Sequence, residues 1–344
     1  MKKGNKYGVH RVIEPEGVLP QPADKIDNTM EIYDNEILID VQTLNIDSAS
    51  FTQIEEEAEG DVEKIKARMK EIVKERGKHH NPVTGSGGML IGEVEKIGPA
   101  LQDRDLEVGD RIATLVSLSL TPLRIDKIKE VKKDIDQVHI DGKAILFESG
   151  IYARLPEDME DTLALAVLDV AGAAAQTAKL VKPGDNVLII GAGGKSGLLC
   201  LHEAKKRAGV TGKVLGMGHS DASTQRIEEL GLADEVLQGD ATKPMEVLEL
   251  VREATDGELV DVVINNVNIP NTEMGSILPC KDGGLIYFFS MATSFTKAAL
   301  GAEGVGKDVE MIVGNGYTRG HAEISLEIMR ENEKLREIFT ELYA

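Results

Sequence analysis

Tryptophan is absent from this chain, and six tyrosines and six phenylalanines are few for 344 residues. Cysteine is also scarce, because only Cys200 and Cys280 occur, each alone in an apolar stretch. Two isolated cysteines provide neither a disulfide framework nor the cysteine pairs of a structural zinc site. We therefore expect a protein of the reducing cytoplasm.

Long apolar runs are missing, so the sequence predicts no membrane-spanning helix. The basic N-terminus, residues 1–6, is followed by no apolar stretch, which is not typical of a secretory signal. Positive charge is scarce too, since 39 lysines and arginines stand against 59 acidic residues and the formal net charge is −20. Such a chain repels nucleic acids and anionic membranes, so we expect neither as a partner, whereas a small cationic substrate fits the charge.

A glycine-rich turn between a predicted strand and a predicted helix is the most informative feature. Residues 186–190 form an apolar, β-branched run, and residues 198–207 mix apolar and charged side chains in a helical pattern. Glycines allow the backbone to approach a ligand closely, and the N-terminus of the following helix favours phosphate. This arrangement is the dinucleotide-binding fingerprint. The expected cofactor-binding residues are Gly191, Gly193, Gly194, Lys195, Ser196 and Gly197.

Predicted strands and helices alternate after this turn, which indicates a doubly wound parallel sheet. Ligands bind at the carboxyl ends of such strands, so the polar residues that follow the strands belong near the cofactor. We expect this of Asn265, Asn266, Asn268, Ser290 and Met291. The strands are expected at 213–218, 234–237, 260–264, 285–289 and 309–313, and the helices at 221–230 and 244–253.

The choice of dinucleotide depends on the residues after the strand at 213–218. An acid at that place binds the adenosine ribose of NAD, and Asp221 is either that acid or the first residue of the next helix. His219 and Ser220, together with Arg226, could instead receive the 2′-phosphate of NADP. The residues leave both cofactors open.

The first half of the chain predicts a small β-rich domain, because its strands are short and separated by glycines. Residues 61–76 predict an amphipathic helix whose apolar face holds Val62, Ile65, Met69, Ile72 and Val73. Residues 319–343 predict one terminal helix or two, with Ile324, Ile328, Leu335 and Ile338 buried. The strands are expected at 36–41, 90–97, 111–115 and 144–147.

Four short motifs, at residues 36–41, 92–98, 108–112 and 182–187, resemble the medium-chain dehydrogenase/reductase superfamily. The resemblance implies an α/β protein with two domains. One is a GroES-like, β-rich catalytic domain, residues 1–155 together with the terminal helix at 319–344. The other is a doubly wound Rossmann domain at residues 156–318. The resemblance also implies a homodimer joined through an edge strand such as residues 309–313.

Three longer segments, residues 10–15, 44–57 and 82–92, resemble the 3,5-diaminohexanoate dehydrogenases of anaerobic lysine fermentation. This closer resemblance implies oxidative deamination of 3,5-diaminohexanoate to 5-amino-3-oxohexanoate, with release of ammonia. It implies a nicotinamide cofactor and favours NAD, with NADP as the other possibility.

Zinc-dependent members of the superfamily bind their metal through a cysteine and a later histidine–glutamate pair. Aligned by the flanking glycines, these positions hold Asp47, Gly88 and Met89. A catalytic zinc usually takes three protein ligands, and only Asp47 remains able to serve. We therefore predict no metal at the site.

The resemblance places Asp47 where the superfamily directs its metal ligand toward the nicotinamide. We predict that Asp47 is the general base of the deamination, with Ser48, Ser50 and Thr52 as hydrogen-bonding neighbours. A capping role for Asp47 at the start of a helix is the alternative.

Charged residues close to these segments are candidates for substrate binding. Glu55 could hold a substrate ammonium, Arg11 could clamp the substrate carboxylate, and His10 could assist proton transfer. The alternatives are a solvated run of charges, a surface arginine and a structural histidine.

Two other functions are compatible with the motifs. A zinc-independent quinone or enone reductase would need no acid beside the nicotinamide. A non-catalytic dinucleotide sensor would bind the cofactor without turnover. The acid at position 47 favours the amine-releasing dehydrogenase.

Overall fold

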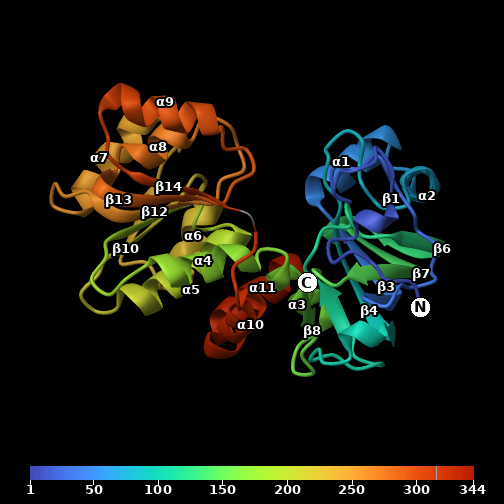
Figure 1. The fold of residues 1–344 in the computed structure, drawn as a ribbon. Helices are drawn as coiled ribbons and strands as arrows, with labels where there is room; N and C mark the ends of the chain where they lie inside the picture. The colour runs from blue at the N-terminus through green and yellow to red at the C-terminus, as the bar shows by residue number, and fades with distance from the viewer. Residues whose placement is uncertain (315) are drawn as a thin grey trace. The chain divides into compact units, whose positions relative to one another are not determined.

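The computed structural model describes residues 1–314 and 316–344, and the chain divides into two compact units, Met1–Leu165 and Ala166–Ala344. Figure 1 shows an antiparallel sheet in the first unit and a parallel sheet in the second. The predicted α/β fold class is therefore confirmed. The division falls inside helix α3 (Asp161–Leu168), later in the chain than the boundary that we expected after residue 155.

The first unit is built on a six-stranded antiparallel sheet of order β6-β7-β3-β4-β5-β8, with β1 and β2 as a separate pair. The strands are β1 (Val12–Glu14), β2 (Lys25–Ile26), β3 (Glu36–Ile46), β4 (Gly88–Ile97), β5 (Arg111–Thr114), β6 (Leu123–Lys132), β7 (Gln137–Phe147) and β8 (Tyr152–Arg154). β3 lies in the interior of the sheet between β7 and β4. It continues beyond its predicted end at Val41 because Leu44 and Ile46 are also buried.

Two helices, α1 (Ser48–Glu57) and α2 (Val62–Arg76), contribute to the core of this unit. The predicted apolar face of α2 is buried except for Val62, which lies in the exposed first turn. α1 was not predicted; it starts directly after β3 and buries Phe51 and Ile54. Asp47 therefore lies at the junction of β3 and α1. Three short 3₁₀ helices complete the unit: η1 (Val9–Arg11), η2 (Pro99–Leu101) and η3 (Lys133–Ile135).

The second unit is a doubly wound parallel sheet of order β11-β10-β9-β12-β13-β14, as predicted. Its first strand, β9, lies in the interior of the sheet; β10 and β11 follow on one side and β12 to β14 on the other. All residues of β9 are buried, as expected for a parallel strand covered on both faces. The strands are β9 (Val187–Ile190), β10 (Val214–Gly218), β11 (Glu235–Gln238), β12 (Val260–Asn265), β13 (Cys280–Phe288) and β14 (Glu310–Val313). α4 (Ala171–Leu180) precedes β9, and the helices between the strands are α5 (Lys195–Ala208), α6 (Asp221–Leu230), α7 (Pro244–Ala254), α8 (Glu273–Ile277) and α9 (Phe295–Val305).

The C-terminal segment forms two helices, α10 (His321–Glu331) and α11 (Glu333–Tyr343), and both belong to the second unit. We expected residues 319–344 to belong with the β-rich domain; within the second unit α10 packs on α4 and α5, and Ser325 Oγ donates to the Ala171 carbonyl. Asn332 separates the two helices, and its side chain caps α11 at the Leu335 N–H. Ile328 and Leu335 are fully buried, whereas Ile324 and Ile338 are half-buried.

Among the helices that the structure describes, none is long and apolar enough to cross a membrane alone. α3 and α4 meet that test of length and composition only together, across a bend of 52°. Most residues of both helices are buried.

Both cysteines are buried free thiols, Cys200 on α5 and Cys280 on β13. Burial raises the pKa of each thiol to about 12. Because the thiolate is the reactive form, neither cysteine is a nucleophile at neutral pH.

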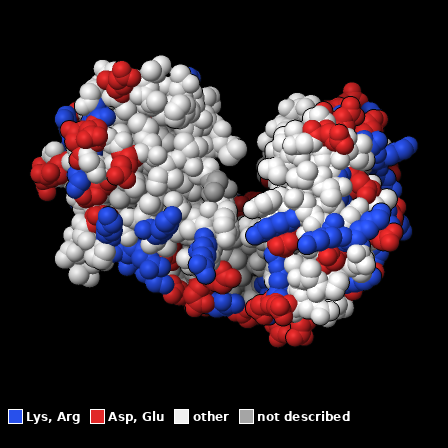
Figure 2. Space-filling model, viewed as in Figure 1, with Lys and Arg blue, Asp and Glu red and all other residues white. Residues whose placement is uncertain are grey.

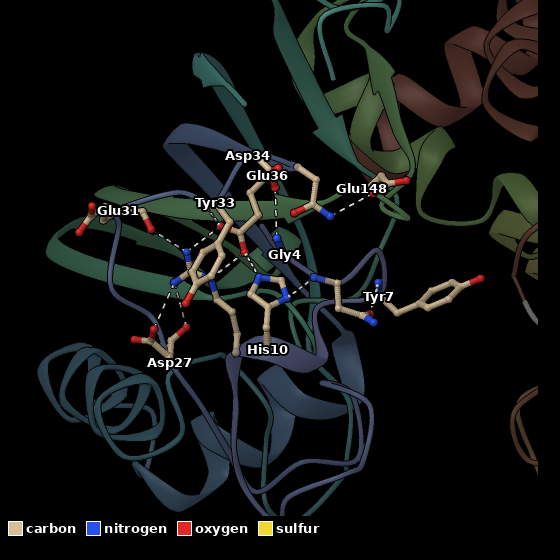
Figure 3. A network of polar contacts seen from close by, with 12 residues as sticks. Gly4, Tyr7, His10, Asp27, Glu31, Tyr33, Asp34, Glu36 and Glu148 are labelled. Atoms are coloured by element: carbon tan, nitrogen blue, oxygen red, sulfur yellow. Dashed lines mark hydrogen bonds and ion pairs between the residues drawn. The ribbon is translucent and has the colours of Figure 1, made fainter. Parts of the chain in front are cut away.

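A buried ion pair ties the N-terminal segment to the first residue of β3 (Figure 3). The side chains of Arg11 and Glu36 are both fully buried, and Arg11 Nε and Nη2 each donate to the Glu36 carboxylate at 2.7 Å. The Nη groups also donate to the carbonyls of Thr29 at 2.6 Å and Glu31 at 2.8 Å. Every nitrogen of the guanidinium therefore has a partner inside the fold.

His10 binds the same carboxylate. The Asn5 N–H donates to His10 Nδ1 at 2.9 Å, so Nε2 carries the ring proton and donates to Glu36 Oε1 at 2.8 Å. The structure contradicts the substrate-binding roles that we predicted for Arg11 and His10, because their polar atoms are engaged within the fold. Both residues are structural.

Burial by itself would raise the pKa of Glu36, but hydrogen bonds from Arg11, His10 and the Tyr33 N–H outweigh burial and lower this pKa from 4.5 to about 2. The folded-state pKa is thus below the unfolded value. The carboxylate therefore stabilises the fold above pH 4.5, and the stabilisation is lost as the pH falls from 4.5 toward 2.

Replacement Glu36→Gln should lower the free energy of unfolding by about 3–5 kcal/mol at neutral pH, because the Arg11 charge stays buried without its partner. The exposed Glu31 provides a matched control, and Glu31→Gln should change the same quantity by less than about 0.5 kcal/mol. Chemical denaturation at a series of pH values measures both. The difference between wild type and Glu36→Gln should shrink as the pH falls below 4.5, and a difference independent of pH would contradict this account.

Candidate functional site

The glycine turn of the second unit is packed so tightly that side chains are excluded. Gly191 has a φ of 77°, which other residues rarely adopt. A Cβ on Gly193 would lie 2.3 Å from the Ser223 carbonyl oxygen, and one on Gly197 would lie 2.1 Å from the Gly191 carbonyl oxygen. The first N–H groups of α5 have no partners within their helix, and they suit a phosphate.

Lys195 and Ser196 occupy the first turn of α5. Lys195 Nζ lies 2.8 Å from Asp169 Oδ2 and 5.8 Å from the centre of the Tyr343 ring. A contact between Lys195 and a pyrophosphate would therefore compete with Asp169. For Ser196, the structure supports the predicted role by position alone.

The residues that follow β12 lie beside the turn. The Asn266 N–H donates to the Ile190 carbonyl at 3.0 Å, and a Cβ on Gly191 would lie 2.8 Å from Val267 Cγ2. Asn266 Nδ2 is buried without a hydrogen-bond partner in the described part of the chain. Asn266 thus remains a candidate cofactor contact.

Asn265 does not fit its predicted role. It is fully buried, its Nδ2 donates to Thr272 Oγ1 and Ser276 Oγ at 2.9 Å, and its Oδ1 accepts from the Val267 N–H. These bonds fix the loop that follows β12, so we withdraw Asn265 as a cofactor ligand. Asn268 and Met291 are exposed, and the buried Ser290 Oγ accepts from the Ala292 N–H at 3.1 Å.

The predicted ribose-binding residues lie at the end of β10 and the start of α6. Ser220 caps α6 by accepting a hydrogen bond from the Ser223 N–H at 3.3 Å. Asp221 Oδ1 accepts from Gln238 Nε2 at 2.9 Å, which fixes its carboxylate at the edge of the sheet. His219 is exposed. Arg226 Nε donates to the Ala222 carbonyl at 3.0 Å.

In the first unit, Asp47 is held by a peptide of the loop that precedes β4. Its Oδ2 accepts from the Gly87 N–H at 2.9 Å, and the Gly87 carbonyl accepts from the Asp47 N–H at 3.4 Å. The Asp47 side chain makes no capping bond to α1, although the residue occupies the N-cap position. The capping alternative is therefore wrong, and the carboxylate is directed by Gly87.

Hydroxyl groups gather around this junction. Ser48 Oγ donates to Asp136 Oδ2 at 2.5 Å. The buried Ser50 Oγ lies 2.6 Å from Thr84 Oγ1 and 2.5 Å from Ser86 Oγ. The hydroxyls of Ser48 and Ser50, which we predicted to be hydrogen-bonding neighbours of Asp47, thus bond to Asp136 and to the loop residues Thr84 and Ser86.

Thr52 and Glu55 lie further along α1. Thr52 is exposed, and the Glu55 carboxylate pairs with Lys133 Nζ at 2.6 Å. Sequence reasoning missed Thr84, Ser86 and Gly87, although their glycine- and hydroxyl-rich loop is a signal of a polar site. It also missed Asp136, for which the sequence offers no signal because that residue comes from a distant hairpin.

One other cluster has the composition of a metal site. Ligand atoms of His202, Glu203 and Glu331 lie within 4.8 Å of one another, in the second unit. Arg207 Nε already donates to Glu203 at 3.0 Å, and Lys206 Nζ donates to Glu331 at 2.5 Å. These two cations neutralise the carboxylates, so the cluster is balanced without a metal ion.

Comparison with solved structures identifies the fold. CurK enoyl reductase has a TM-score of 0.56 at 16% identity, with 93% of this chain and 86% of that chain covered. Escherichia coli quinone oxidoreductase complexed with NADPH has a TM-score of 0.52 at 17% identity, with 90% and 81% covered. At these identities only the fold is shared. It is the fold of these two reductases.

Comparison of sequences identifies the family. Residues 10–156 match the L-erythro-3,5-diaminohexanoate dehydrogenase N-terminal domain. The L-erythro-3,5-diaminohexanoate dehydrogenase of Acetoanaerobium sticklandii is 66% identical over 342 residues, 99% of each chain. The protein of the same name from Fusobacterium nucleatum is 67% identical over 344 residues, 100% of each chain. The chain belongs to the L-erythro-3,5-diaminohexanoate dehydrogenase family.

Proposed function

We propose that this protein oxidises L-erythro-3,5-diaminohexanoate in the degradation of lysine. The observation that supports this most strongly is the 66% and 67% identity, over essentially the whole chain, to two dehydrogenases of that name. Carbon C3, which bears the neutral amine, loses its hydrogen as hydride to the nicotinamide, water adds to the resulting iminium, and ammonia leaves. The products are 5-amino-3-oxohexanoate, reduced cofactor, ammonium and a proton.

The two alternative functions have less support. Quinone and enoyl reductases share the fold at 16–17% identity, which is no evidence for their substrates. A non-catalytic sensor would not require the full-length similarity to dehydrogenases.

Asp47 is the residue that we propose as general base. The reacting amine must be neutral before hydride leaves its carbon, and a proton must leave the attacking water. Asp47 lies at the N-cap position of α1, directly after β3. The Gly87 N–H orients the Asp47 carboxylate. Ser48 and Ser50 extend the polar surface beside it.

Replacement Asp47→Asn should reduce kcat by about 10²–10⁴-fold, the usual contribution of a general base, while cofactor affinity stays unchanged. Formation of reduced nicotinamide, followed by absorbance and matched to ammonia release, measures the effect. Asp40→Asn on the same strand is the control, since Asp40 is exposed. Loss of activity by less than a few fold in Asp47→Asn would exclude the proposed role.

Substrate recognition requires a partner for the second ammonium, which stays charged on C5. We propose Asp136 for it in place of Glu55, whose carboxylate is paired with Lys133. Asp136 is half-buried and is joined to the Asp47 junction through Ser48 Oγ at 2.5 Å and through the Ile46 N–H, which donates to the Asp136 carbonyl at 3.0 Å. Two neighbouring carboxylates match a substrate whose two amine-bearing carbons, C3 and C5, are separated by a single carbon.

Replacement Asp136→Asn should raise KM for the diamino substrate by about tenfold, the cost of a weakened charged hydrogen bond. The variant should leave KM for 3-aminohexanoate unchanged, because that compound lacks the C5 ammonium. Asp134→Asn is the matched control, as Asp134 is exposed two residues away. Equal changes in KM for both compounds would show that Asp136 does not bind the C5 ammonium.

NAD is the dinucleotide that we propose, with NADP as the alternative. Asp221 is fixed at the end of β10 by Gln238, where its carboxylate can accept from the ribose hydroxyls and repel a 2′-phosphate. The kcat/KM for NAD should therefore exceed that for NADP by at least tenfold in the coupled ammonia assay. A higher value for NADP would assign His219, Ser220 and Arg226 to the phosphate instead.

We further propose a homodimer and a cytoplasmic location. β14 is the edge strand of the parallel sheet, and its residues Met311, Ile312 and Val313 are apolar and only partly buried or exposed. An exposed apolar edge favours pairing with a second copy. The two unpaired thiols fit a reducing compartment.

A further inference from the structure

A cavity of about 570 Å³ lies in the second unit, on the face of β13 and β14 that α4 and α10 border. Its walls combine apolar and basic side chains. The apolar part includes Tyr287, Ile312 and Ile324, and the basic part consists of Lys179, Arg207 and Arg319. The volume is that of a metabolite-sized pocket.

The charge of this cavity is opposite to that of the chain. The protein has 59 acidic and 39 basic residues, yet no acidic residue is among the described residues that line the cavity. Figure 2 shows basic side chains gathered over the part of this unit that α4 and α5 occupy in Figure 1. Like charges in one pocket repel one another, and an anion bound between them would remove that repulsion.

The three cations keep donors available. Arg207 bonds to Glu203 through Nε at 3.0 Å, and its Nη groups have no hydrogen-bond partner within residues 1–314 and 316–344. Over the same residues, Lys179 and Arg319 have no ion pair. Charged donors without partners are a suitable lining for carboxylate or phosphate groups.

Neutral donors add to this lining. Gln176 Oε1 accepts from Thr318 Oγ1 at 2.6 Å, which directs the carbonyl of that amide away and keeps its NH₂ group as a donor. Burial raises the pKa of the Tyr287 phenol, so the hydroxyl stays protonated at neutral pH and can donate as well. The cavity thus offers donors from several elements around an apolar floor.

The cavity is separate from the dinucleotide turn. Arg207 lies in the last turn of α5, whereas the glycine turn precedes the first. A helix of 14 residues spans about 21 Å at 1.5 Å per residue. None of the glycines from Gly191 to Gly197 lines the cavity. Ile312 and Val313 belong both to the cavity lining and to β14, so the cavity borders the edge at which we propose pairing of a second copy.

We propose that this cavity is a second anion site, which binds a small organic molecule with two or more carboxylate or phosphate groups. Lys179, Arg207 and Arg319 bind the anionic groups, and Tyr287, Ile312 and Ile324 contact the carbon skeleton. The inference is independent of the proposed reaction. A bound polyanion would join α4, the C-terminal end of α5 and the segment that leads into α10.

Isothermal titration of the full-length protein with citrate and with inorganic pyrophosphate tests the proposal. The dinucleotide turn is first saturated with NADH, so that pyrophosphate cannot bind there. At least one of the two probes should bind with 1:1 stoichiometry, and its affinity should fall as salt is added. Tighter binding of citrate would identify a carboxylate site, and tighter binding of pyrophosphate a phosphate site.

The double variant Lys179→Gln/Arg319→Gln should weaken this binding by at least tenfold. Both side chains are exposed, so the variant should keep the thermal unfolding midpoint and the NADH affinity of the wild type. Lys334→Gln on α11 removes an equally exposed positive charge outside the cavity and should leave binding unchanged. Failure of both probes to bind, or equal weakening by the control, would overturn the proposal.

Discussion

The first unit depends on strand β3, whose two ends are fixed by carboxylates in different environments. At the start of the strand, Glu36 is fully buried and bonded to Arg11 and His10, and these hydrogen bonds lower its pKa to about 2. At the other end, Asp47 is half-buried and accepts a hydrogen bond from the loop peptide at Gly87. The first carboxylate is saturated with donors and serves stability. The second is accessible, as proton transfer requires.

The second unit depends on a steric constraint rather than on charge. A Cβ atom at position 193 would clash with the backbone oxygen of Ser223, and one at position 197 would clash with the backbone oxygen of Gly191. This packing brings the start of α5 against the end of β9 and sets the position of its free N–H groups. The loop after β12 is fixed to the same place through Asn265, whose amide bonds Thr272 and Ser276. The conformation of the predicted phosphate-binding turn is therefore set by packing within the fold.

Most of the fold could be predicted from the sequence, because its signals are local. The alternation of strands and helices, the glycine turn and the face of α2 all follow from residues a few positions apart. α1 was missed because polar and acidic side chains outnumber its buried Phe51 and Ile54. The terminal helices were expected with the β-rich domain but fall within the second compact unit, since an apolar face indicates burial but does not identify the surface that covers it.

The candidate site was less predictable, because it depends on pairs far apart in the chain. Arg11 was predicted to bind substrate, but its partner Glu36 is 25 residues away, and burial of that pair has no local signature. Asp136 contacts Ser48 across 88 residues. Asn265 follows a strand as a ligand would, yet its amide is used inside the loop. Asp47 was predicted from its alignment with the superfamily, and Ser48 and Ser50 were predicted because they are its neighbours in sequence.

The burial of both thiols has a practical consequence for spectroscopy on this protein. With Cys200 and Cys280 enclosed and their pKa values near 12, the native chain presents no reactive cysteine to a maleimide or nitroxide reagent. One cysteine introduced on the surface of each unit would therefore be labelled selectively. Because the chain also lacks tryptophan, the emission of bound reduced nicotinamide would be free of indole background. Distances between the two units could then be followed through the catalytic cycle without first removing any native residue.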